Sequence, residues 1–210
     1  MKNIVTFIVF IALLIILFCG CQGDISNEGH GSSDATENTK LAVWQTAYLE
    51  FLGTKKEEYD SFALVYIDDD DIPELYMSGV GEAVGDSVCT FKDGSVAEES
   101  LNRIGGGKYV ERSGKIINCN GSMGRIYTHA YKLYEGEFVL TFTALSVEQV
   151  KYIEDEEYEI SYEYAIEGKP VSEKEYNAAV EAVFDSSSWI PLDEDAVDFV
   201  TIRQQIINLK

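Results

Sequence analysis

Four X-Gly dipeptides between short apolar segments constrain the fold of this chain more than any other feature. They are Asp93-Gly94, Ser113-Gly114, Glu135-Gly136 and Glu167-Gly168, and each is flanked by residues that favour β-strands. Asp-Gly is a strong signal for a two-residue hairpin, because both central residues of a type I′ turn need positive φ. The other three dipeptides are weaker forms of that signal. Their unequal spacing argues against a repeat and predicts an antiparallel meander.

Two more strands are expected on either side of an acidic segment, VYIDDDDIPELYMS (65–78). Residues 61–67 form a continuous apolar run that is typical of a buried strand, and residues 74–79 read as the returning strand. The aspartates between them therefore belong to a hairpin-type connection. Further loops are predicted at residues 105–107 and at Asn120-Gly121, where glycine interrupts the apolar pattern.

Helical patterns occur at both ends of this strand-rich region. Residues 41–52 place large apolar side chains at helical spacing, and Gly53 is predicted to end that helix; the side chains are Leu41, Trp44, Tyr48 and Leu52. Ser172 and Glu175 form a capping box that begins a second helix, expected to run to about Phe184.

A last helix is predicted to start at Asp193 or Asp195 and to end at Leu209, with Val197, Val200 and Ile207 facing inward. The expected fold class is therefore α+β: an antiparallel β-meander sheet backed by an N-terminal helix and two C-terminal helices. Residues 41–210 should form a single domain.

The N-terminal residues 1–20 read as a lipoprotein signal peptide. Lys2 is followed by an apolar stretch over residues 4–18, which suits a signal peptide and is short for a membrane-spanning helix of about 20 residues. Phe18-Cys19-Gly20-Cys21 resembles a bacterial lipobox, and the resemblance implies that Cys21 becomes the lipidated N-terminus. An uncleaved membrane anchor and ordinary signal cleavage are the alternatives.

Residues 21–40 are expected to be the lipidated cysteine and a disordered tether, since the segment is rich in Gly, Ser, Asn and Asp. His30 lies in this tether and reads as a spacer residue rather than a ligand. The predicted location is the outer, extracytoplasmic face of the bacterial cell membrane, with the membrane bound through the lipid anchor.

The formal net charge of −21 at pH 7 limits the classes of partner. A chain this acidic repels phosphate backbones, so no nucleic-acid partner is expected. The charge favours cations or a basic partner, and it also serves solubility outside the cell.

The aspartate run is the candidate metal site. Asp68, Asp70 and Glu74 alternate in the manner of calcium loops, and Asp69 and Asp71 are further candidate ligands for Ca²⁺. An EF-hand loop needs a Gly at its sixth position and a Glu at its twelfth, and this stretch is too short for that pattern. A solvated, self-capped turn is the competing interpretation.

Cys89 and Cys119 both fall in predicted strands of an exported domain, where a disulfide is chemically allowed. Two buried free thiols are the equal alternative, because nothing in the sequence brings the two sites together. The chain has no CxxC pair and no Cys/His cluster, so a zinc or iron–sulfur site is not supported.

The sequence offers no recognisable catalytic constellation. His129 stands alone in a strand beside aromatic residues, which is typical of a packed or half-exposed histidine, and no GxSxG elbow occurs. The acidic run 154–157 reads as a solvated loop. We expect a non-enzymatic binding or interaction module, with an envelope protein or a glycan as partner. The alternative is a carbohydrate-active hydrolase of the cell envelope that uses paired carboxylates, which one sequence cannot locate.

The segment LVYIDDDDIPEL is similar to a motif, I-D-x-[DN]-x-D-x-I-P-E-L, of a family of uncharacterised lipoproteins from Gram-positive, clostridia-like bacteria. The order of the remaining features agrees: a lipobox, a polar tether, a helix with a W..AYLEFL pattern, X-Gly hairpins, and YAIEGKPVSEKEY before the closing helices. The resemblance implies the location and the architecture rather than a chemistry. The motif also looks like calcium-binding loops, but this chain has no Gly among its aspartates.

Overall fold

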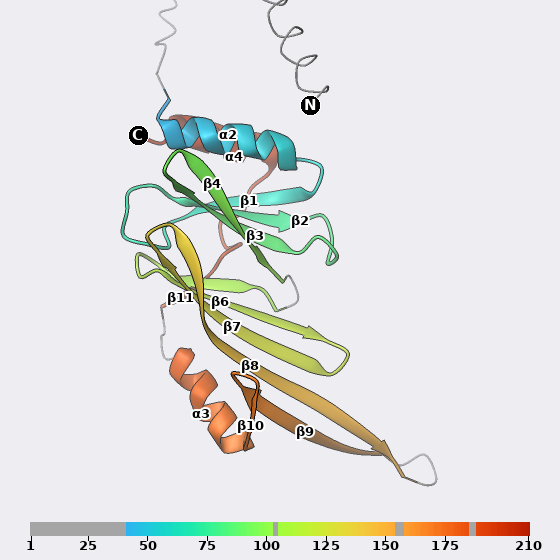
Figure 1. Ribbon diagram of the computed structural model, residues 1–210. Coiled ribbons are helices and arrows are strands. Elements are labelled where there is room, and N and C mark those ends of the chain that lie inside the picture. The colour runs from blue at the N-terminus through green and yellow to red at the C-terminus, as the bar shows by residue number, and fades with distance from the viewer. Residues whose placement is uncertain (1–40, 103–104, 154–157, 185–187) are drawn as a thin grey trace, which may run out of the picture. The chain divides into compact units, whose positions relative to one another are not determined.

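The computed structural model describes residues 41–102, 105–153, 158–184 and 188–210 (Figure 1). The predicted signal peptide, Cys21, the tether with His30, the acidic run 154–157 and the loop at Asp185 lie outside the described residues. The predicted α+β class is confirmed, with antiparallel strands, one N-terminal helix and two C-terminal helices. The strands form two separate sheets, whereas the sequence analysis predicted one.

The first sheet has four strands in the order β1-β2-β3-β4, so it is a simple meander. Its strands are β1 (Tyr59–Val65), β2 (Glu74–Gly79), β3 (Asp86–Lys92) and β4 (Ser95–Leu101). The strand predicted over residues 74–79 is confirmed, and the strand predicted over residues 61–67 is shifted two residues toward the N-terminus. Asp93 and Gly94 form the predicted two-residue turn, with φ of 51° and 85°.

The second sheet has seven strands in the order β10-β9-β8-β7-β6-β5-β11. Its strands are β5 (Gly107–Val110), β6 (Lys115–Ser122), β7 (Arg125–Tyr134), β8 (Glu137–Tyr152), β9 (Tyr158–Ile166), β10 (Lys169–Val171) and β11 (Trp189–Pro191). The sequence analysis missed β11, which has only three residues and ends in a proline. It lies at the sheet edge beside β5, where a missing N–H is tolerated.

The turn predictions hold where the X-Gly pair directly joins two strands. Glu135-Gly136 and Glu167-Gly168 are two-residue turns, and all four residues have positive φ. Ser113-Gly114 instead ends a longer loop, because β5 already stops at Val110. The loop predicted at Asn120-Gly121 is wrong: both residues lie within β6, and Met123-Gly124 makes the turn with φ of 51° and 75°.

Helix α2 (Val43–Lys55) and helix α4 (Phe199–Asn208) contact each other and lie against the four-stranded sheet, whereas α3 (Glu173–Val183) lies beside β9. Gly53 does not end α2, which continues for two more residues. The Ser172–Glu175 capping box is confirmed, and α3 ends one residue before Phe184.

The last helix begins later than predicted, because the side chain of Asp198 caps it by accepting a hydrogen bond from Thr201 N–H (2.8 Å). This start changes the buried face. Ile202 and Ile206 are buried, whereas Val200 is 76% exposed, so its predicted inward orientation is wrong. Val197 precedes the helix and joins β1 instead, in a bridge to Phe62.

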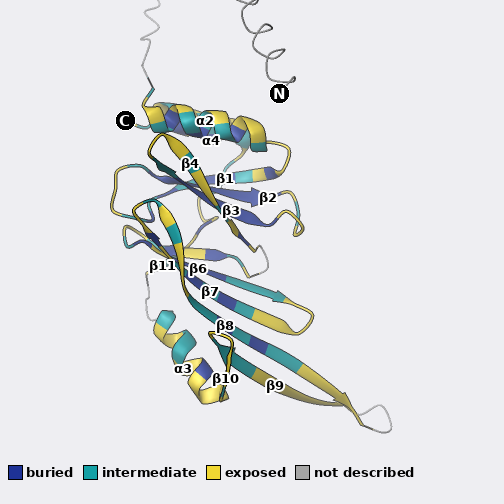
Figure 2. Cartoon of the chain, in the orientation of Figure 1, coloured by how far each residue is buried: buried dark blue, intermediate teal, exposed yellow. Residues whose placement is uncertain are grey.

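The core has two parts, one on each face of the four-stranded sheet (Figure 2). One cluster packs α2 and α4 on the sheet through side chains such as Tyr48, Phe62 and Ile202. The other joins the two sheets through side chains such as Val65, Ile116 and Leu133. Because both faces of the four-stranded sheet are covered, every residue of β2 is buried.

Candidate functional site

The aspartate run forms a turn that hydrogen-bonds to itself. Asp68 Oδ1 accepts from Asp70 N–H (3.2 Å), and Asp70 Oδ1 accepts from Ile72 N–H (2.7 Å). Aspartates commonly stabilise turns in this way. Arg112 adds a cation from the loop after β5, with Nη1 3.3 Å from the Asp70 carbonyl oxygen and 3.9 Å from Asp71 Oδ1. The geometry is therefore that of a capped turn at the surface.

Glu74 follows this turn at the start of β2, and its side chain is buried. Its side chain accepts hydrogen bonds from Ile67 N–H at Oε2 (2.8 Å) and from the Thr90 hydroxyl at Oε1 (3.3 Å), and the residue is only 1% exposed. Burial raises the pKa of Glu74 to about 8, and the negative charges of Asp68 and Asp70 add to the shift. The side chain of Glu74 thus bonds back across the turn to the backbone of Ile67.

The predicted convergence of Asp68, Asp70 and Glu74 on a cation is therefore not found. Asp69 and Asp71 do not replace Glu74, because no group of three His, Cys, Asp or Glu side chains within the described residues is placed to hold a metal ion. Glu74 does not converge with Asp68 and Asp70 because it begins a fully buried strand, so its side chain lies in the core.

We expect the melting temperature of the protein to be the same in millimolar Ca²⁺ and in EDTA, because the turn already satisfies itself with hydrogen bonds. Differential scanning calorimetry on the full-length chain measures this. A higher melting temperature in Ca²⁺ that the substitution Asp70→Asn abolishes would establish the calcium loop instead.

The disulfide that the sequence allowed is not formed. Cys89 is a free, buried thiol on β3 and packs in the cluster under α2 and α4, whereas Cys119 is a free, half-buried thiol on β6 of the other sheet. Cys119 Sγ lies 3.9 Å from the Thr128 hydroxyl oxygen. The two cysteines are in different sheets and face different packing layers, so the alternative of two free thiols is the one observed.

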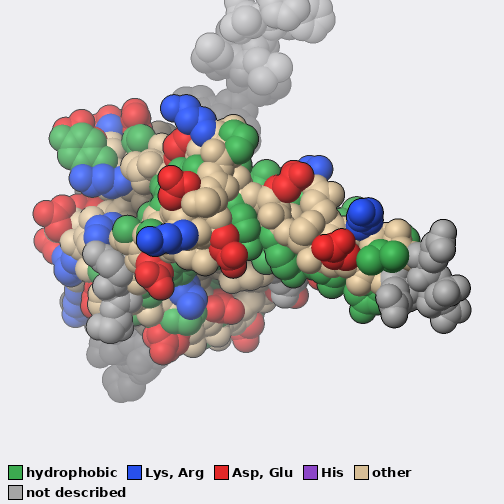
Figure 3. Space-filling model, turned by 90° about the horizontal axis from the view of Figure 1, so that it is seen from below, with side chains coloured by type: hydrophobic (Ala, Val, Ile, Leu, Met, Phe, Trp, Pro, Cys, Tyr) green, Lys and Arg blue, Asp and Glu red, His purple; other side chains and the backbone are tan. Residues whose placement is uncertain are grey.

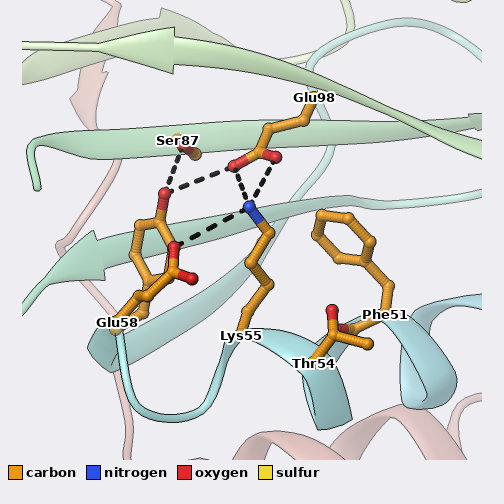
Figure 4. A network of polar contacts seen from close by, with 7 residues as sticks. Phe51, Thr54, Lys55, Glu58, Ser87 and Glu98 are labelled. Atoms are coloured by element: carbon orange, nitrogen blue, oxygen red, sulfur yellow. Dashed lines mark hydrogen bonds and ion pairs between the residues drawn. The ribbon is translucent and has the colours of Figure 1, made fainter.

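A polar network that the sequence analysis missed ties the end of α2 to the four-stranded sheet (Figure 4). Lys55 Nζ lies 2.9 Å and 3.2 Å from the two carboxylate oxygens of Glu98, and Tyr59 OH lies 2.9 Å from Ser87 Oγ. The hydrogen bond to Glu98 raises the pKa of Lys55 above its usual value. Ser87 is 1% exposed, so the network holds the fold together rather than facing a substrate.

His129 is half-buried on β7, as predicted for a histidine beside aromatic residues. The rings of Tyr127 and Tyr131 lie on either side of it, each with its centroid 6.3 Å from the imidazole. A small groove borders His129, but none of the described residues that line it carries a carboxylate. The groove therefore provides no acid–base pair for His129.

Several large apolar side chains are exposed together at the end of the β8–β9 hairpin. Strand β7 pairs with β8 only as far as Val147, so beyond that point β8 and β9 form a two-stranded ribbon. Large side chains on one side of this ribbon are exposed by 46 to 82%: Val150, Tyr152, Tyr158, Ile160 and Tyr162. We call these five residues the ribbon face; Figure 3 shows hydrophobic side chains along the ribbon, together with both acidic and basic ones, at the right of the view.

An open groove of about 720 Å³ lies beside the ribbon face, between β9, β10 and the start of α3. Its lining includes Tyr162 and Tyr164, whose rings stack with centroids 6.3 Å apart, together with Val171 and Glu173. The Glu167-Gly168 turn and the β-favouring residues before it predicted the strand. They did not show that the strand would extend beyond its neighbours, because that depends on where β7 and β10 end.

The comparisons with protein-family models, with curated proteins and with solved structures found no match for this chain. No helix within the described residues is long and apolar enough to cross a membrane. The site is therefore interpreted from its geometry and from the sequence.

Proposed function

We propose that this chain is a lipid-anchored, extracytoplasmic binding module that holds its partner at the ribbon face without catalysis. Cys21 carries the lipid, residues 22–40 act as the tether, and residues 41–210 are the binding domain on the outer face of the bacterial membrane. The anchor rests on the lipobox resemblance, and the binding role rests on the ribbon.

The observation that carries the proposal is the exposure of the ribbon face. Neither a helix nor a third strand within the described residues covers Tyr152 or Tyr158, which are 82% and 61% exposed. A two-stranded ribbon gains little stability by itself, so its exposed aromatic rings do not serve the core. Contiguous apolar patches of this kind are typical of interaction surfaces, and tyrosine is enriched where proteins bind one another.

The alternative function, a hydrolase that uses two carboxylates, gains no support from Glu74. A raised pKa is expected of a catalytic acid, but the pKa of Glu74 is raised because the group is buried in the core. None of the grooves described above includes Glu74 in its lining. A catalytic acid must reach its substrate, and this group is enclosed.

Site-specific photo-cross-linking in the cells that produce the protein tests the proposal. A benzophenone side chain at Tyr162 should give a discrete cross-linked adduct in the membrane fraction, because this position belongs to the ribbon face and is retained in all variants. The matched control is the same side chain at Val200, which is also exposed but lies on α4. The substitution Cys21→Ser should move both proteins out of the membrane fraction and greatly reduce the Tyr162 adduct.

Equal adducts at both positions, or none at Tyr162, would contradict a docking role for the ribbon. Membrane retention of the Cys21→Ser variant would contradict the lipid anchor. The two parts of the proposal are thus tested separately.

A further inference from the structure

Two-thirds of the outer edge of β9 have no neighbouring strand among the described residues. Strand β10 pairs only with Tyr164, Ala165 and Ile166, and it ends at Val171. Within the part of the chain that the structure describes, no strand pairs with the outer side of residues 158–163. Figure 2 shows this stretch as largely exposed. An unpaired edge of this kind is a template for adding another strand.

The direction of the backbone groups follows from one hydrogen bond. Glu167 N–H donates to the carbonyl oxygen of Thr143 on β8 (3.0 Å), so the odd-numbered residues of β9 direct their backbone groups toward β8. The even-numbered residues alternate with them and direct theirs to the outer edge. Tyr158, Ile160 and Tyr162 therefore present backbone N–H and C=O groups along the open edge.

The side chains of residues 158–163 differ in chemistry between the two faces of the strand. Tyr158, Ile160 and Tyr162 lie on the ribbon face, whereas Glu159, Ser161 and Glu163 lie on the opposite face, because successive side chains of a strand alternate. A strand added at this edge would meet aromatic and aliphatic groups on one side and carboxylates on the other. Its own best pattern is therefore apolar residues alternating with basic ones.

The charge of the ribbon identifies the kind of partner. Among the described residues of the ribbon, acidic side chains outnumber basic ones: Glu148, Glu159 and Glu163 stand against Lys151. A second copy of the chain also carries a net charge of −21, so the two copies would repel each other. A cationic segment would be attracted, and its charges would lie near Glu163 and near Glu159, whose cross-strand partner is Lys151.

We infer that the outer edge of β9 binds an extended segment of a cationic partner protein as an added β-strand, with alternating apolar and basic side chains. The inference rests on the proposed function and names the partner's chemistry. Strand addition supplies main-chain hydrogen bonds for affinity, and the alternating side chains supply specificity. The groove beside Tyr162 and Val171 leaves room for a segment that continues the line of β10.

The ribbon has a second, shorter open edge that serves as a control. Glu148 N–H donates to the carbonyl oxygen of Gly124 (2.6 Å), so the even-numbered residues of β8 face that side. Only Val150 and Tyr152 lie on it beyond the β6–β7 turn. The open edge of β9 offers three residues whose backbone groups face outward, whereas that of β8 offers two. We therefore take β9 as the docking edge.

Proline substitutions test which of the two edges, that of β9 or that of β8, binds the added strand. The probe is a fluorescein-labelled, capped nine-residue peptide in which Lys alternates with Val, and the full-length chain is held in a neutral detergent. Fluorescence anisotropy should show saturable binding that weakens with salt. Ile160→Pro removes an outward N–H of β9 and should weaken binding at least tenfold, whereas Val150→Pro removes an outward N–H of β8 and should change it less than twofold.

Amide hydrogen exchange in the unmodified protein gives a second readout that does not depend on either variant. The peptide should slow exchange at Ile160 and Tyr162 and leave Val150 and Tyr152 unchanged. Equal effects of the two proline substitutions, protection only on β8, or equal binding of a peptide with Glu in place of Lys would overturn the inference.

Failure of this inference is distinguishable from failure of the proposed function. If the Lys–Val peptide does not bind but the Tyr162 adduct forms in cells, strand addition is wrong and the docking role stands. An N-acetylglucosamine oligosaccharide that binds the protein and its Ile160→Pro variant equally, where the peptide does not bind, would also overturn the inference, because it would assign the ribbon face to a glycan.

Discussion

Replacing Glu74 with Gln should abolish most of the loss of stability that we expect of the unmodified protein between acid and mildly alkaline pH. The pKa of this carboxyl is raised from 4.5 to about 8 in the fold. The folded protein therefore keeps a proton on Glu74 over a pH range in which the unfolded chain has released it. Stability falls with rising pH wherever the folded state binds more protons.

The sign and the pH range follow from these two values. The stabilising contribution of the protonated form is fully present below pH 4.5, decreases as the pH rises, and is lost above about pH 8. At about 1.4 kcal/mol per pH unit, the free energy of unfolding should fall by about 3–5 kcal/mol over this range. Gln keeps the acceptor for Ile67 N–H and has no proton to lose, so its stability should be nearly constant here.

Urea unfolding at several pH values measures the difference between the unmodified protein and the Glu74→Gln variant. Glu159→Gln, at an exposed carboxyl on β9, is the matched control and should leave the pH dependence unchanged. A pH profile of Glu74→Gln that runs parallel to that of the unmodified protein would show that Glu74 ionises normally in the fold. The buried orientation of its side chain would then be wrong.

The local parts of this fold were predictable from the sequence, because their signals lie within a few residues. The two-residue turns at Asp93-Gly94, Glu135-Gly136 and Glu167-Gly168 follow from the backbone that glycine permits. The capping box at Ser172 follows from two side chains that are three residues apart. Neither prediction needs any knowledge of the packing between elements.

The parts that the sequence could not predict depend on packing between distant segments. The break between the two sheets falls between β4 and β5, and each of these strands pairs well with its own neighbour in the sequence. Val200 looked like an inward residue, but the Asp198 cap and the burial of Ile202 and Ile206 set the helix face. Glu74 looked like a ligand because its strand begins next to the aspartates, yet both faces of that strand are covered.

The candidate site likewise has a part that the sequence predicts and a part that depends on packing between distant segments. The sequence predicted the strands that became β8 and β9, but the exposure of the ribbon face arises because β7 stops at Val147 and β10 pairs no further than Tyr164. The aspartate run is a candidate metal site in the sequence because Asp68, Asp70 and Glu74 alternate as in calcium loops. In the fold Asp68 and Asp70 cap a turn, and the exposed ribbon face lies on the other sheet.

Shortening the ribbon should remove docking and leave the fold intact. Replacing residues 150–160 with Asn-Gly joins Gln149 to Ser161, which are paired across the hairpin. Their backbone groups face each other, as a two-residue turn requires. The change removes four residues of the ribbon face and keeps Tyr162 as the position for the photo-reactive side chain.

Combining this shortened chain with the Tyr162 cross-link in cells is the most direct test of the account. We expect the adduct to disappear, while the free energy of unfolding stays within about 1 kcal/mol of its original value, because exposed ribbon residues contribute little to the core. If the adduct persists, docking does not depend on the ribbon and the proposed function is wrong. If the shortened chain loses several kcal/mol of stability, the ribbon is part of the folding core rather than a docking surface, which also contradicts the proposal.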